Sequence, residues 1–387
     1  MAKRIAILGS TGSIGKNALR VIDSLGGDYE VFALSAHSSV ELLAEQVRYY
    51  RPKYAAVTNA DYVEQLKKLI GGLDVEILAG PEGLIDIAQL NEVDIVLTAV
   101  VGAAGLGAVL GAAKKGKRLA IANKEPLVMA GELLTCAVRG SGGQIVPVDS
   151  EHSAVFQAMQ SGRGEQVSRI ILTASGGPFR QAGPEQIEKV TVEEALAHPV
   201  WDMGPKITID SATMMNKALE VIEAHWLFGV DVDKIEVLVH PESIVHSLVE
   251  FVDGSVIAQL GWPDMCLPIQ YALTYPQRAP GISRRLRLEE VGTLTFEKPD
   301  LERFRLLSLG FEVARAGGTA AVVFNAANEA AVEQFLAGRI KFVNIAELVE
   351  HCVDKHRVRT GVSLDELLEA DAWARKEVIE CLKQKVE

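Results

Sequence analysis

Two carboxylates close a short apolar run in the first half of this 387-residue chain. The run Gln144–Val148 is typical of a buried strand, and Asp149, Ser150 and Glu151 follow it directly. In open α/β sheets, ligands bind beyond the carboxyl ends of the strands. Two acids one residue apart can bind one cation, and hard cations such as Mg2+ or Mn2+ prefer oxygen ligands. The alternative is a polar cap on the following helix, which this stretch taken alone favours.

A second polar group lies on one face of a helix predicted in the second half of the chain. Asp210 or Ser211 suits the N-cap of that helix. Polar residues then recur at helical spacing between apolar ones, at Thr213, Asn216, Lys217, Glu220 and Glu223. A solvated stripe is the usual explanation of such a pattern. Alternatively the stripe lines a site, where Asn216 and Lys217 bind an anion and Glu220 supplies a third metal oxygen.

The first predicted strand, Arg4–Leu8, runs into a glycine-rich turn and then an amphipathic helix to about Leu25. The first glycine permits a tight turn, the second lets the backbone approach a pyrophosphate, and the third allows close helix–strand packing. The helix N-terminus then offers free N–H groups to the anion. This setting favours a dinucleotide site over an ordinary turn. The turn comprises Gly9, Ser10, Thr11, Gly12, Ser13, Ile14 and Gly15.

These residues need a sheet to position them, and strand-like and helical segments alternate throughout the first part of the chain. The alternation predicts an α/β fold with a Rossmann-like, doubly wound parallel sheet. The strands are expected at Arg4–Leu8, Glu30–Leu34, Tyr54–Thr58, Val75–Ala79, Ile95–Val100, Arg118–Ala122 and Gln144–Val148.

A β-rich part follows. The segments Ser168–Ala174 and Ile235–Val239 are expected strands, and Ile244–Val252 pairs with Ser255–Leu260 through a turn at Asp253–Gly254. Such a hairpin sheet could carry a dimer contact. Residues 276–299 are irregular and rich in Arg and Pro, as in a linker, and the remainder is helical in pattern.

Two other strand ends carry polar residues. Asn123, Lys124 and Glu125 follow one strand, where the lysine could bind a substrate hydroxyl or carbonyl; a solvated turn is the alternative. Ser175 precedes two glycines and could form a backbone nest for an anion, or a plain turn.

Residues 179–205 show no core periodicity, and a loop of this length in a compact protein is more often functional than idle. A lid that closes over a small substrate is expected, carrying His198, Trp201 and Met203. The alternative for Trp201 is that it pins the loop to the surface.

The formal net charge of -12 argues against nucleic acid as a partner, because phosphate backbones need a basic surface. Four scattered cysteines without metal-type spacing, and no apparent signal peptide, indicate a cytoplasmic protein. The uncharged segment Ile95–Ala113 contains four glycines, so a soluble strand–turn–helix unit is expected rather than a membrane span.

Together these motifs closely resemble the 1-deoxy-D-xylulose 5-phosphate reductoisomerase family. The resemblance extends over essentially the whole chain, and the block Asp210–Lys217 is its most specific part. The remaining motifs are the glycine turn, Asn123–Glu125, Val148–His152, Ser175–Phe179, Glu220 and Asn325–Glu329.

The resemblance implies an NADPH-dependent enzyme that also needs a divalent metal (Mg2+, Mn2+ or Co2+), acts on a sugar phosphate, and forms a homodimer. It implies an NADPH-binding domain at residues 1–149, a catalytic and dimerisation domain at 150–275, a linker at 276–300 and a helical domain at 301–387. It assigns the metal to Asp149, Glu151 and Glu220, and it counts Lys124 and His198 among the catalytic residues.

The resemblance also implies binding residues for the substrate and the cofactor. The substrate residues are Lys124, Ser150, Glu151, Ser175, His198, Trp201, Ser211, Asn216, Lys217 and Glu220. The cofactor residues are Gly9, Ser10, Thr11, Gly12, Ser13, Ile14, Gly15, Ala36, His37, Ser38, Ser39, Asn123, Glu125 and Gly204.

The chain departs from the family pattern at Pro126, where a serine is frequent, and between residues 36 and 39, where some members carry a lysine. No acid follows the second strand before Glu41, so a 2′-phosphate meets no like charge. NADPH is therefore expected over NADH, by a modest margin that widens at lower pH if His37 contributes.

Two rival functions remain open. A semialdehyde-type dehydrogenase shares this fold but needs a catalytic cysteine. A nucleotide-sensing regulator would have no use for three metal-binding carboxylates.

Overall fold

The computed structural model describes residues 2–201 and 203–384. Asp202 of the expected lid and residues 385–387 of the expected helical domain lie outside the described residues. The chain forms two compact units. The first comprises Met1–Pro126, Glu132–Phe156 and Asp264–Arg285; the second comprises Leu127–Gly131, Gln157–Pro263 and Leu286–Glu387. The division inferred from sequence at 149, 275 and 300 stays a prediction.

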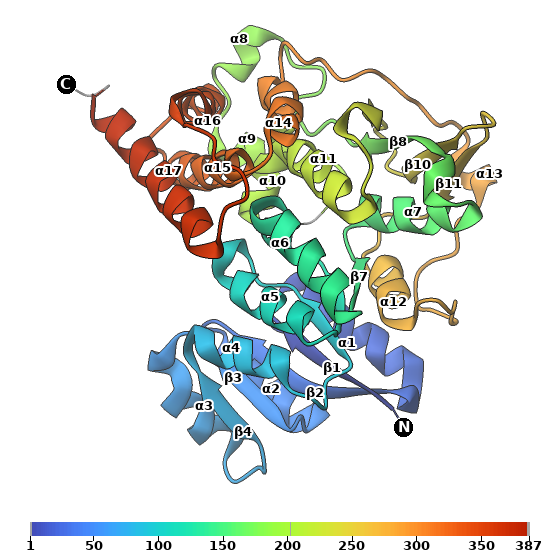
Figure 1. The fold of residues 1–387 in the computed structure, drawn as a ribbon, viewed down its shortest axis with the longest axis vertical. Coiled ribbons are helices and arrows are strands. Elements are labelled where there is room, and N and C mark those ends of the chain that lie inside the picture. Colours follow the sequence, from blue (N-terminus) through green and yellow to red (C-terminus); the bar gives the residue numbers. More distant parts are fainter. Residues whose placement is uncertain (1, 202, 385–387) are drawn as a thin grey trace. The chain divides into compact units, whose positions relative to one another are not determined.

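The first unit contains a seven-stranded sheet in the order β4-β3-β2-β1-β5-β6-β7, and all its strand pairs are parallel (Figure 1). The expected doubly wound sheet is thus confirmed. The strands are β1 (Lys3–Leu8), β2 (Tyr29–Ala36), β3 (Tyr54–Val57), β4 (Glu76–Ala79), β5 (Ile95–Thr98), β6 (Arg118–Ile121) and β7 (Gln144–Pro147).

Helices connect these strands and cover the sheet. Side chains from α1, α2, α3 and α12 pack on one face around Ile5, Ile7 and Leu97, because residues two apart on a strand point the same way. The helices are α1 (Ser13–Leu25), α2 (Val40–Tyr50), α3 (Val63–Ile70), α4 (Gly80–Gln89), α5 (Leu106–Lys114), α6 (Glu125–Ser141, which both units share), α7 (Ser150–Ala158) and α12 (Cys266–Thr274).

The sheet reverses its direction of growth between β1 and β5. Ligands of such sheets bind beyond the strand ends at this switch point. The segment Ile95–Ala113 supplies β5, a single 3-10 turn and α5. Within the described part of the chain, none of the helices combines the length and the apolar character that a membrane crossing needs.

The second unit contains a four-stranded sheet in the order β11-β10-β8-β9. The hairpin expected at Asp253–Gly254 is present, since β10 pairs antiparallel with β11. The strands are β8 (Val167–Ala174), β9 (Ile235–Val239), β10 (Val245–Phe251) and β11 (Val256–Leu260).

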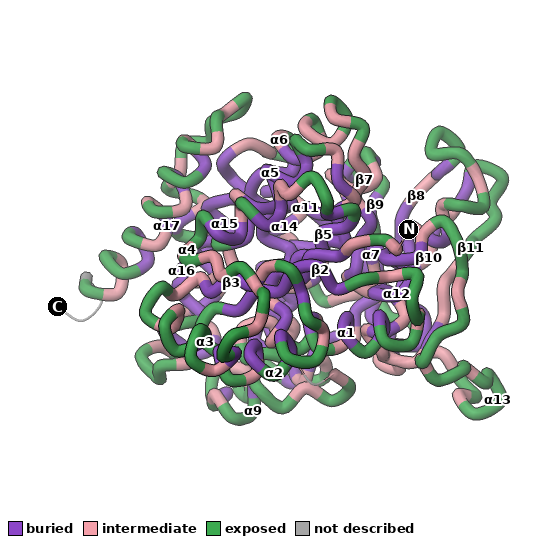
Figure 2. The backbone as a smooth tube through the Cα atoms, turned by 90° about the horizontal axis from the view of Figure 1, so that it is seen from below, coloured by how far each residue is buried: buried purple, intermediate pink, exposed green. Residues whose placement is uncertain are grey.

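The helices of the second unit include the C-terminal bundle. Almost every residue of α15 is buried, including the polar Asn325 and Asn328, whereas α13 is exposed (Figure 2). These helices are α8 (Pro184–Ile187), α9 (Val192–Leu196), α10 (Pro205–Ala212), α11 (Met215–Phe228), α13 (Leu288–Val291), α14 (Arg305–Ala316), α15 (Thr319–Leu336), α16 (Val343–Lys355) and α17 (Leu364–Gln384).

The structure corrects the expected start of the polar helix. Asp210 and Ser211 do not cap it; they lie inside α10, which begins earlier because Gly204 is its N-cap and Pro205 its first residue. Met214 then adopts a left-handed conformation with φ 60°, and this break separates α10 from α11.

Two segments are more ordered than their sequences suggest. The stretch 179–205 contains the short helices α8 and α9. The linker includes one turn of helix, α13, and its Glu297 forms a β-bridge with Val239.

Candidate active site

The turn after β1 is shaped for close backbone approach. A Cβ at Gly15 would lie 2.4 Å from the carbonyl oxygen of Gly9, so only glycine lets α1 start this near the strand. Gly12 is the N-cap of α1 and supplies no side-chain cap. The first N–H groups of the helix are therefore available to an anion, as a bound pyrophosphate requires.

Hydrogen bonds of Ser10 hold this turn against β2 and α2. Its backbone N–H donates to Ser35 at 2.8 Å, and its buried hydroxyl lies 2.7 Å from Oε1 of Gln46. The amide nitrogen of Gln46 donates in return to the backbone oxygen of Ser10 at 3.0 Å. Thr11, Gly12 and the helix start face outward more than Ser10 does.

The end of β2 carries the residues predicted to receive the 2′-phosphate. Ala36 is buried, whereas His37, Ser38 and Ser39 are exposed. Nδ1 of His37 lies 2.8 Å from Oγ1 of Thr58. Ser39 precedes the first residue of α2 without capping it through its side chain.

The end of β6 holds a buried ion pair. The ammonium group of Lys124, 8% exposed, donates to a carboxylate oxygen of Asp149, which follows β7. Because β6 and β7 are parallel neighbours, their carboxyl ends bring these two residues together. Asn123 and Glu125 are buried beside Lys124. Among the described residues, no hydrogen-bond partner is present for the side-chain amide of Asn123.

The two residues after Asp149 begin α7. The hydroxyl of Ser150 donates to Oε2 of Glu151 at 2.5 Å. Both side chains are partly buried, so the neighbouring ends of β6 and β7 present two carboxylates, a hydroxyl and the ammonium group of Lys124.

The polar stripe of α11 is buried, so the solvated interpretation is wrong. Lys217 is 3% exposed and Glu220 is 0% exposed. Nζ of Lys217 donates to one oxygen of Glu220, and Nδ2 of Asn216 donates to the other at 2.6 Å. A carboxylate this deep needs cationic or hydrogen-bonding partners, and these donors supply them.

The loop after β8 contains Gly176 and Gly177, the pair predicted from the sequence to form an anion nest. Both residues have positive φ, at 82° and 65°, a backbone conformation that favours glycine. A Cβ at Gly177 would lie 2.8 Å from the backbone oxygen of Ser211, so this loop packs directly against the end of α10. Oγ of Ser175 accepts from the N–H of Gly177 at 3.2 Å.

His198 connects the predicted lid to this nest. Its Nδ1 accepts from the backbone N–H groups of Val200 and Trp201 at 3.2 and 2.9 Å. The neutral ring therefore carries its proton on Nε2, which donates to Oγ of Ser175 at 3.1 Å. Burial lowers the pKa of His198 below its ordinary value, which favours this neutral form.

The rest of the predicted lid is partly covered. Trp201 and Met203 are half-buried. Gly204 is exposed and begins α10 as its N-cap.

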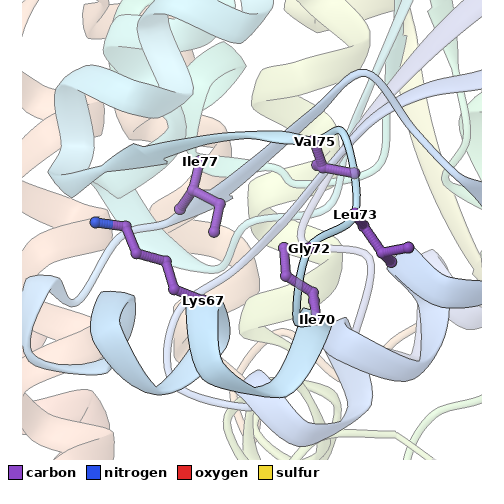
Figure 3. A pocket seen from close by; sticks show the side chains of 6 residues that line it. All are labelled: Lys67, Ile70, Gly72, Leu73, Val75 and Ile77. Atoms are coloured by element: carbon purple, nitrogen blue, oxygen red, sulfur yellow. The ribbon is translucent and has the colours of Figure 1, made fainter.

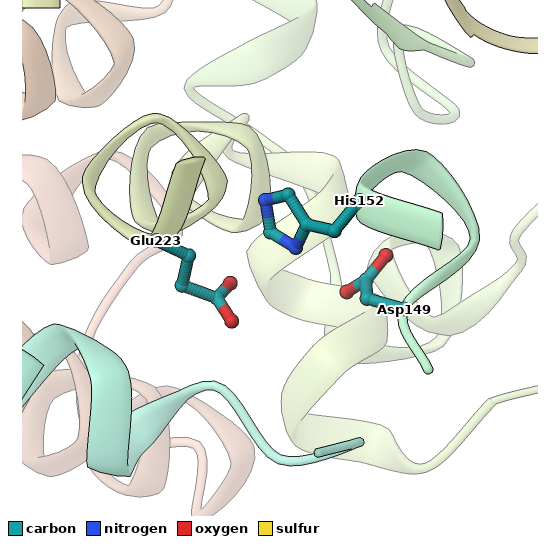
Figure 4. A group of neighbouring side chains, drawn as sticks. All are labelled: Asp149, His152 and Glu223. Atoms are coloured by element: carbon teal, nitrogen blue, oxygen red, sulfur yellow. The ribbon is translucent and has the colours of Figure 1, made fainter. Parts of the chain in front are cut away.

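Sequence reasoning gave no role to His152 and treated Glu223 only as part of the stripe, yet both are buried. Figure 4 draws them with Asp149: His152 belongs to α7 and Glu223 to α11. Their imidazole and carboxylate groups are of the kinds that can bind a metal ion. The available signal was spacing, since His152 follows Asp149 by three residues and Glu223 follows Glu220 by three.

The pocket in Figure 3 offers no comparable chemistry. It has a volume of about 290 Å3 and lies beside α3 and the edge strand β4. Its lining is apolar except for Lys67, which is already paired with Glu64.

The donor groups fit the two cofactors expected from the sequence. Asp149, Glu151 and Glu220 offer only carboxylate oxygens, which suit Mg2+ or Mn2+ and are poor for softer metals. The glycine turn leaves backbone room and uncapped N–H groups for a dinucleotide.

A parallel sheet with a glycine-rich turn at its switch point, followed by a second unit, is typical of α/β dinucleotide-dependent oxidoreductases. Family models agree and are more specific. The model for 1-deoxy-D-xylulose 5-phosphate reductoisomerase matches residues 5–131, and two models for its C-terminal domains match 145–228 and 260–377. The chain belongs to the 1-deoxy-D-xylulose 5-phosphate reductoisomerase family.

Individual relatives cover almost the whole chain. The 1-deoxy-D-xylulose 5-phosphate reductoisomerase of Chloroherpeton thalassium is 52% identical over 376 residues, or 97% of each chain. The Zymomonas mobilis enzyme, solved in complex with NADPH, is 42% identical with a TM-score of 0.93 over 99% of each chain. A structure of DOX-P reductoisomerase with NADPH, fosmidomycin and magnesium has 42% identity and a TM-score of 0.95, covering 100% of this chain and 99% of the other.

Proposed function

We propose that this chain converts 1-deoxy-D-xylulose 5-phosphate into 2-C-methyl-D-erythritol 4-phosphate, with NADPH and a divalent metal, in the non-mevalonate route to isoprenoid precursors. The observation that carries the proposal is the match to family members over 97% of the chain. The oxygen-donor carboxylates, the anion nest and the uncapped glycine turn each support one part of it.

The metal ligands are proposed to be Asp149, Glu151 and Glu220. A divalent ion bound there would polarise the substrate ketone and acidify its neighbouring hydroxyl. Lys124 and Ser150 lie beside these acids, and they would orient the two substrate oxygens through N–H and O–H donation. The alternative ligand set is Asp149 with His152 and Glu223.

The phosphate group would bind in the second unit. Ser175 and the glycine nest offer O–H and N–H donors, and Ser211 is packed against that nest. Asn216 and Lys217 at the start of α11 would complete the binding, with the ammonium group supplying positive charge. The net charge of -12 makes such local capture necessary.

NADPH would supply the hydride that reduces the rearranged aldehyde. The turn Gly9–Gly15 would hold its pyrophosphate, and Ser38 and Ser39 would face the 2′-phosphate. Asn123, Glu125 and Gly204 complete the proposed contacts. His198, Trp201 and Met203 would close over the substrate and exclude water while the carbon skeleton rearranges.

The test is NADPH oxidation by the purified chain with the sugar phosphate, with and without Mg2+, Mn2+ or Co2+. Metal-dependent turnover is expected, and its absence with all three ions would overturn the proposal. Thiol alkylation tests the alternative function, a semialdehyde-type dehydrogenase, which needs a catalytic cysteine. Activity should survive alkylation if the proposal is correct. Burial already raises the pKa of Cys266 to about 11, which disfavours a nucleophilic thiolate.

The proposal also includes the oligomeric state, the cellular location and the domain boundaries. A homodimer is supported by the edge strand β11, which exposes Val256 and Ile257; a monomeric mass in light scattering at micromolar concentration would contradict it. A cytoplasmic location is supported by four free cysteines. The cofactor, catalytic, linker and helical parts are proposed to divide at 149, 275 and 300.

Binding of NADPH and the sugar phosphate should protect residues 179–205 from proteolysis. The stretch has only short helices, and closure over ligands would add contacts that it otherwise lacks. Limited proteolysis followed by mass spectrometry measures the cleavage rate. Equal cleavage within the stretch with and without both ligands would count against a lid.

The same stretch should become easier to cleave as the pH falls. Because burial lowers the pKa of His198, its stabilising contacts are complete above its ordinary value of 6.5 and are lost as the pH falls through the lowered value. Protonated Nδ1 can no longer accept from Val200 and Trp201. His198→Gln should remove this pH dependence; a variant that retained it would show that another group titrates.

NADPH should be preferred to NADH, by less than in relatives with a basic residue at this position. Residues 36–39 include exposed serines and no acid, and His37 adds positive charge only when protonated. The measurement is kcat/KM for both cofactors between about pH 6 and 8. An NADH preference in that range would contradict the prediction. An NADPH preference that does not change with pH and is retained in His37→Ala would show only that His37 does not contribute to it.

A further inference from the structure

Asp210 is a buried acid in the helix that carries Ser211. It is 1% exposed and lies near the C-terminal end of α10. Its Oδ2 pairs with the ammonium group of Lys206, one turn earlier, at 2.8 Å. Its Oδ1 accepts from the side-chain amide of Asn328 at 2.8 Å, and Asn328 lies 118 residues further along the chain.

The last residues of α10 contact the glycine loop after β8. Gly177 approaches the backbone of Ser211 and Ala212 so closely that a Cβ would lie 2.8 Å from one and 3.2 Å from the other. A shift of α10 would therefore move Ser211 and would also displace the loop that contains Gly176 and Gly177. Asp210, one residue before Ser211, is the anchor nearest to this contact.

The chain does not continue from α10 into α11 as one unbroken helix. Met214 breaks the helix with φ 60°, so Ser211 lies before the break and Asn216 and Lys217 lie after it. Ser211 and the pair Asn216 and Lys217 therefore lie on different helices, and each helix needs its own packing contacts to hold its residues in place. For α10, α15 contributes to that support together with α9 and α11: α10 contacts α15, the helix that carries Asn328 (Figure 1).

The helix α15 is itself well anchored. Asn328 is 0% exposed. One residue later, Glu329 pairs with Arg375 of α17 at 2.5 Å, and Arg375 also pairs with Asp371 at 2.7 Å. A helix that is buried and held by ion pairs can fix the position of a neighbouring helix that bonds to it.

We infer that Asn328 is a positioning residue for the phosphate subsite, acting through Asp210 on α10. The C-terminal helical bundle thereby takes part in substrate binding, although Asn328 is not among the residues proposed to bind the metal or the substrate. The inference rests on the proposed function for the identity of the phosphate ligand.

Asn328→Ala tests the inference. The KM for the sugar phosphate should rise about tenfold, the effect of losing one hydrogen bond to a charged group, while kcat changes far less. The KM for NADPH, and kcat/KM for the same ketose without its phosphate, should stay unchanged. The unphosphorylated ketose is informative because general loosening of the site would weaken its turnover as well.

Asn325→Ala is the matched control, because Asn325 is equally buried on the same helix but donates to Glu329. It should lower the thermal midpoint without changing the KM for the sugar phosphate. If both variants raise that KM equally, or if Asn328→Ala leaves it at the wild-type value, the inference is wrong. Where Asn328→Ala does not fold, Asp210→Asn combined with Asn328→Leu removes the contact without leaving a buried charge, and the same rise is expected.

Inorganic phosphate supplies a readout independent of turnover. Phosphate should raise the thermal midpoint of the wild type, and it should do so less for Asn328→Ala than for Asn325→Ala. An equal shift in all three proteins would overturn the inference. A wild type that fails to turn over the sugar phosphate would overturn the proposed function, yet this comparison would still decide the role of Asn328.

Discussion

Glu220→Gln is expected to keep the fold and to lose at least roughly 100-fold in turnover at limiting metal, because a neutral amide is a much weaker metal ligand than a carboxylate. The change preserves shape, which matters because Glu220 is 0% exposed. The change also removes the negative charge that pairs with the ammonium group of Lys217. Measuring kcat and the activating metal concentration together, with a thermal midpoint as the check on folding, tests this expectation.

Glu223→Gln is the matched control, since Glu223 is 2% exposed and lies one turn further along the same helix. It should leave the activating metal concentration near that of the wild type. Near-normal activity of Glu220→Gln at limiting metal would remove Glu220 from the ligand set. If Glu223→Gln lost metal affinity instead, the ligands would be Asp149, His152 and Glu223.

The parallel sheet could be predicted because its signal is local. Strands such as β3 and β6 are short apolar runs between helical segments, and observed strand ends lie within about two residues of expectation, the usual uncertainty of boundaries. The glycine turn could also be predicted from the sequence. Its backbone segments can approach one another closely only because Gly9 and Gly15 have no side chains.

The burial of the α11 stripe could not be read from its sequence. A polar face at helical spacing looks the same whether it meets water or the interior of a unit, and tertiary packing decides between them. Lys217 and Glu220 can be buried because each supplies the charge that the other needs. The resemblance, not the periodicity, had favoured the site interpretation.

The helix boundary near Met214 was missed for a related reason. Asp210 and Ser211 are good N-cap residues, but Gly204 and Pro205 start a helix earlier. The role of Asp210 depends on Asn328, and a contact over 118 residues leaves no local pattern. The spacing of Lys206 and Asp210 by four residues was the available hint of a buried pair.

Lys124→Met should reduce turnover by at least roughly 100-fold, while metal affinity stays the same or increases. The two effects separate because the ammonium group of Lys124 donates to Asp149, and a metal would compete for the same carboxylate. Removing the ammonium group favours the metal and removes the group proposed to orient the substrate oxygens. Methionine preserves the length of a side chain that is 8% exposed. Metal titration by calorimetry, beside steady-state kinetics, measures both effects.

Lys117→Met provides the control, because Lys117 is equally buried at 8% exposure but lies before β6, at the opposite end of that strand. Its ammonium group donates to the backbone oxygens of Leu90, Asn91 and Val93. Losing those contacts should lower the free energy of unfolding by roughly 1–3 kcal/mol and leave kcat unchanged. If Lys124→Met lost turnover and metal affinity in proportion, Lys124 would act only by holding Asp149 for the metal, and its proposed contact with the substrate would be wrong.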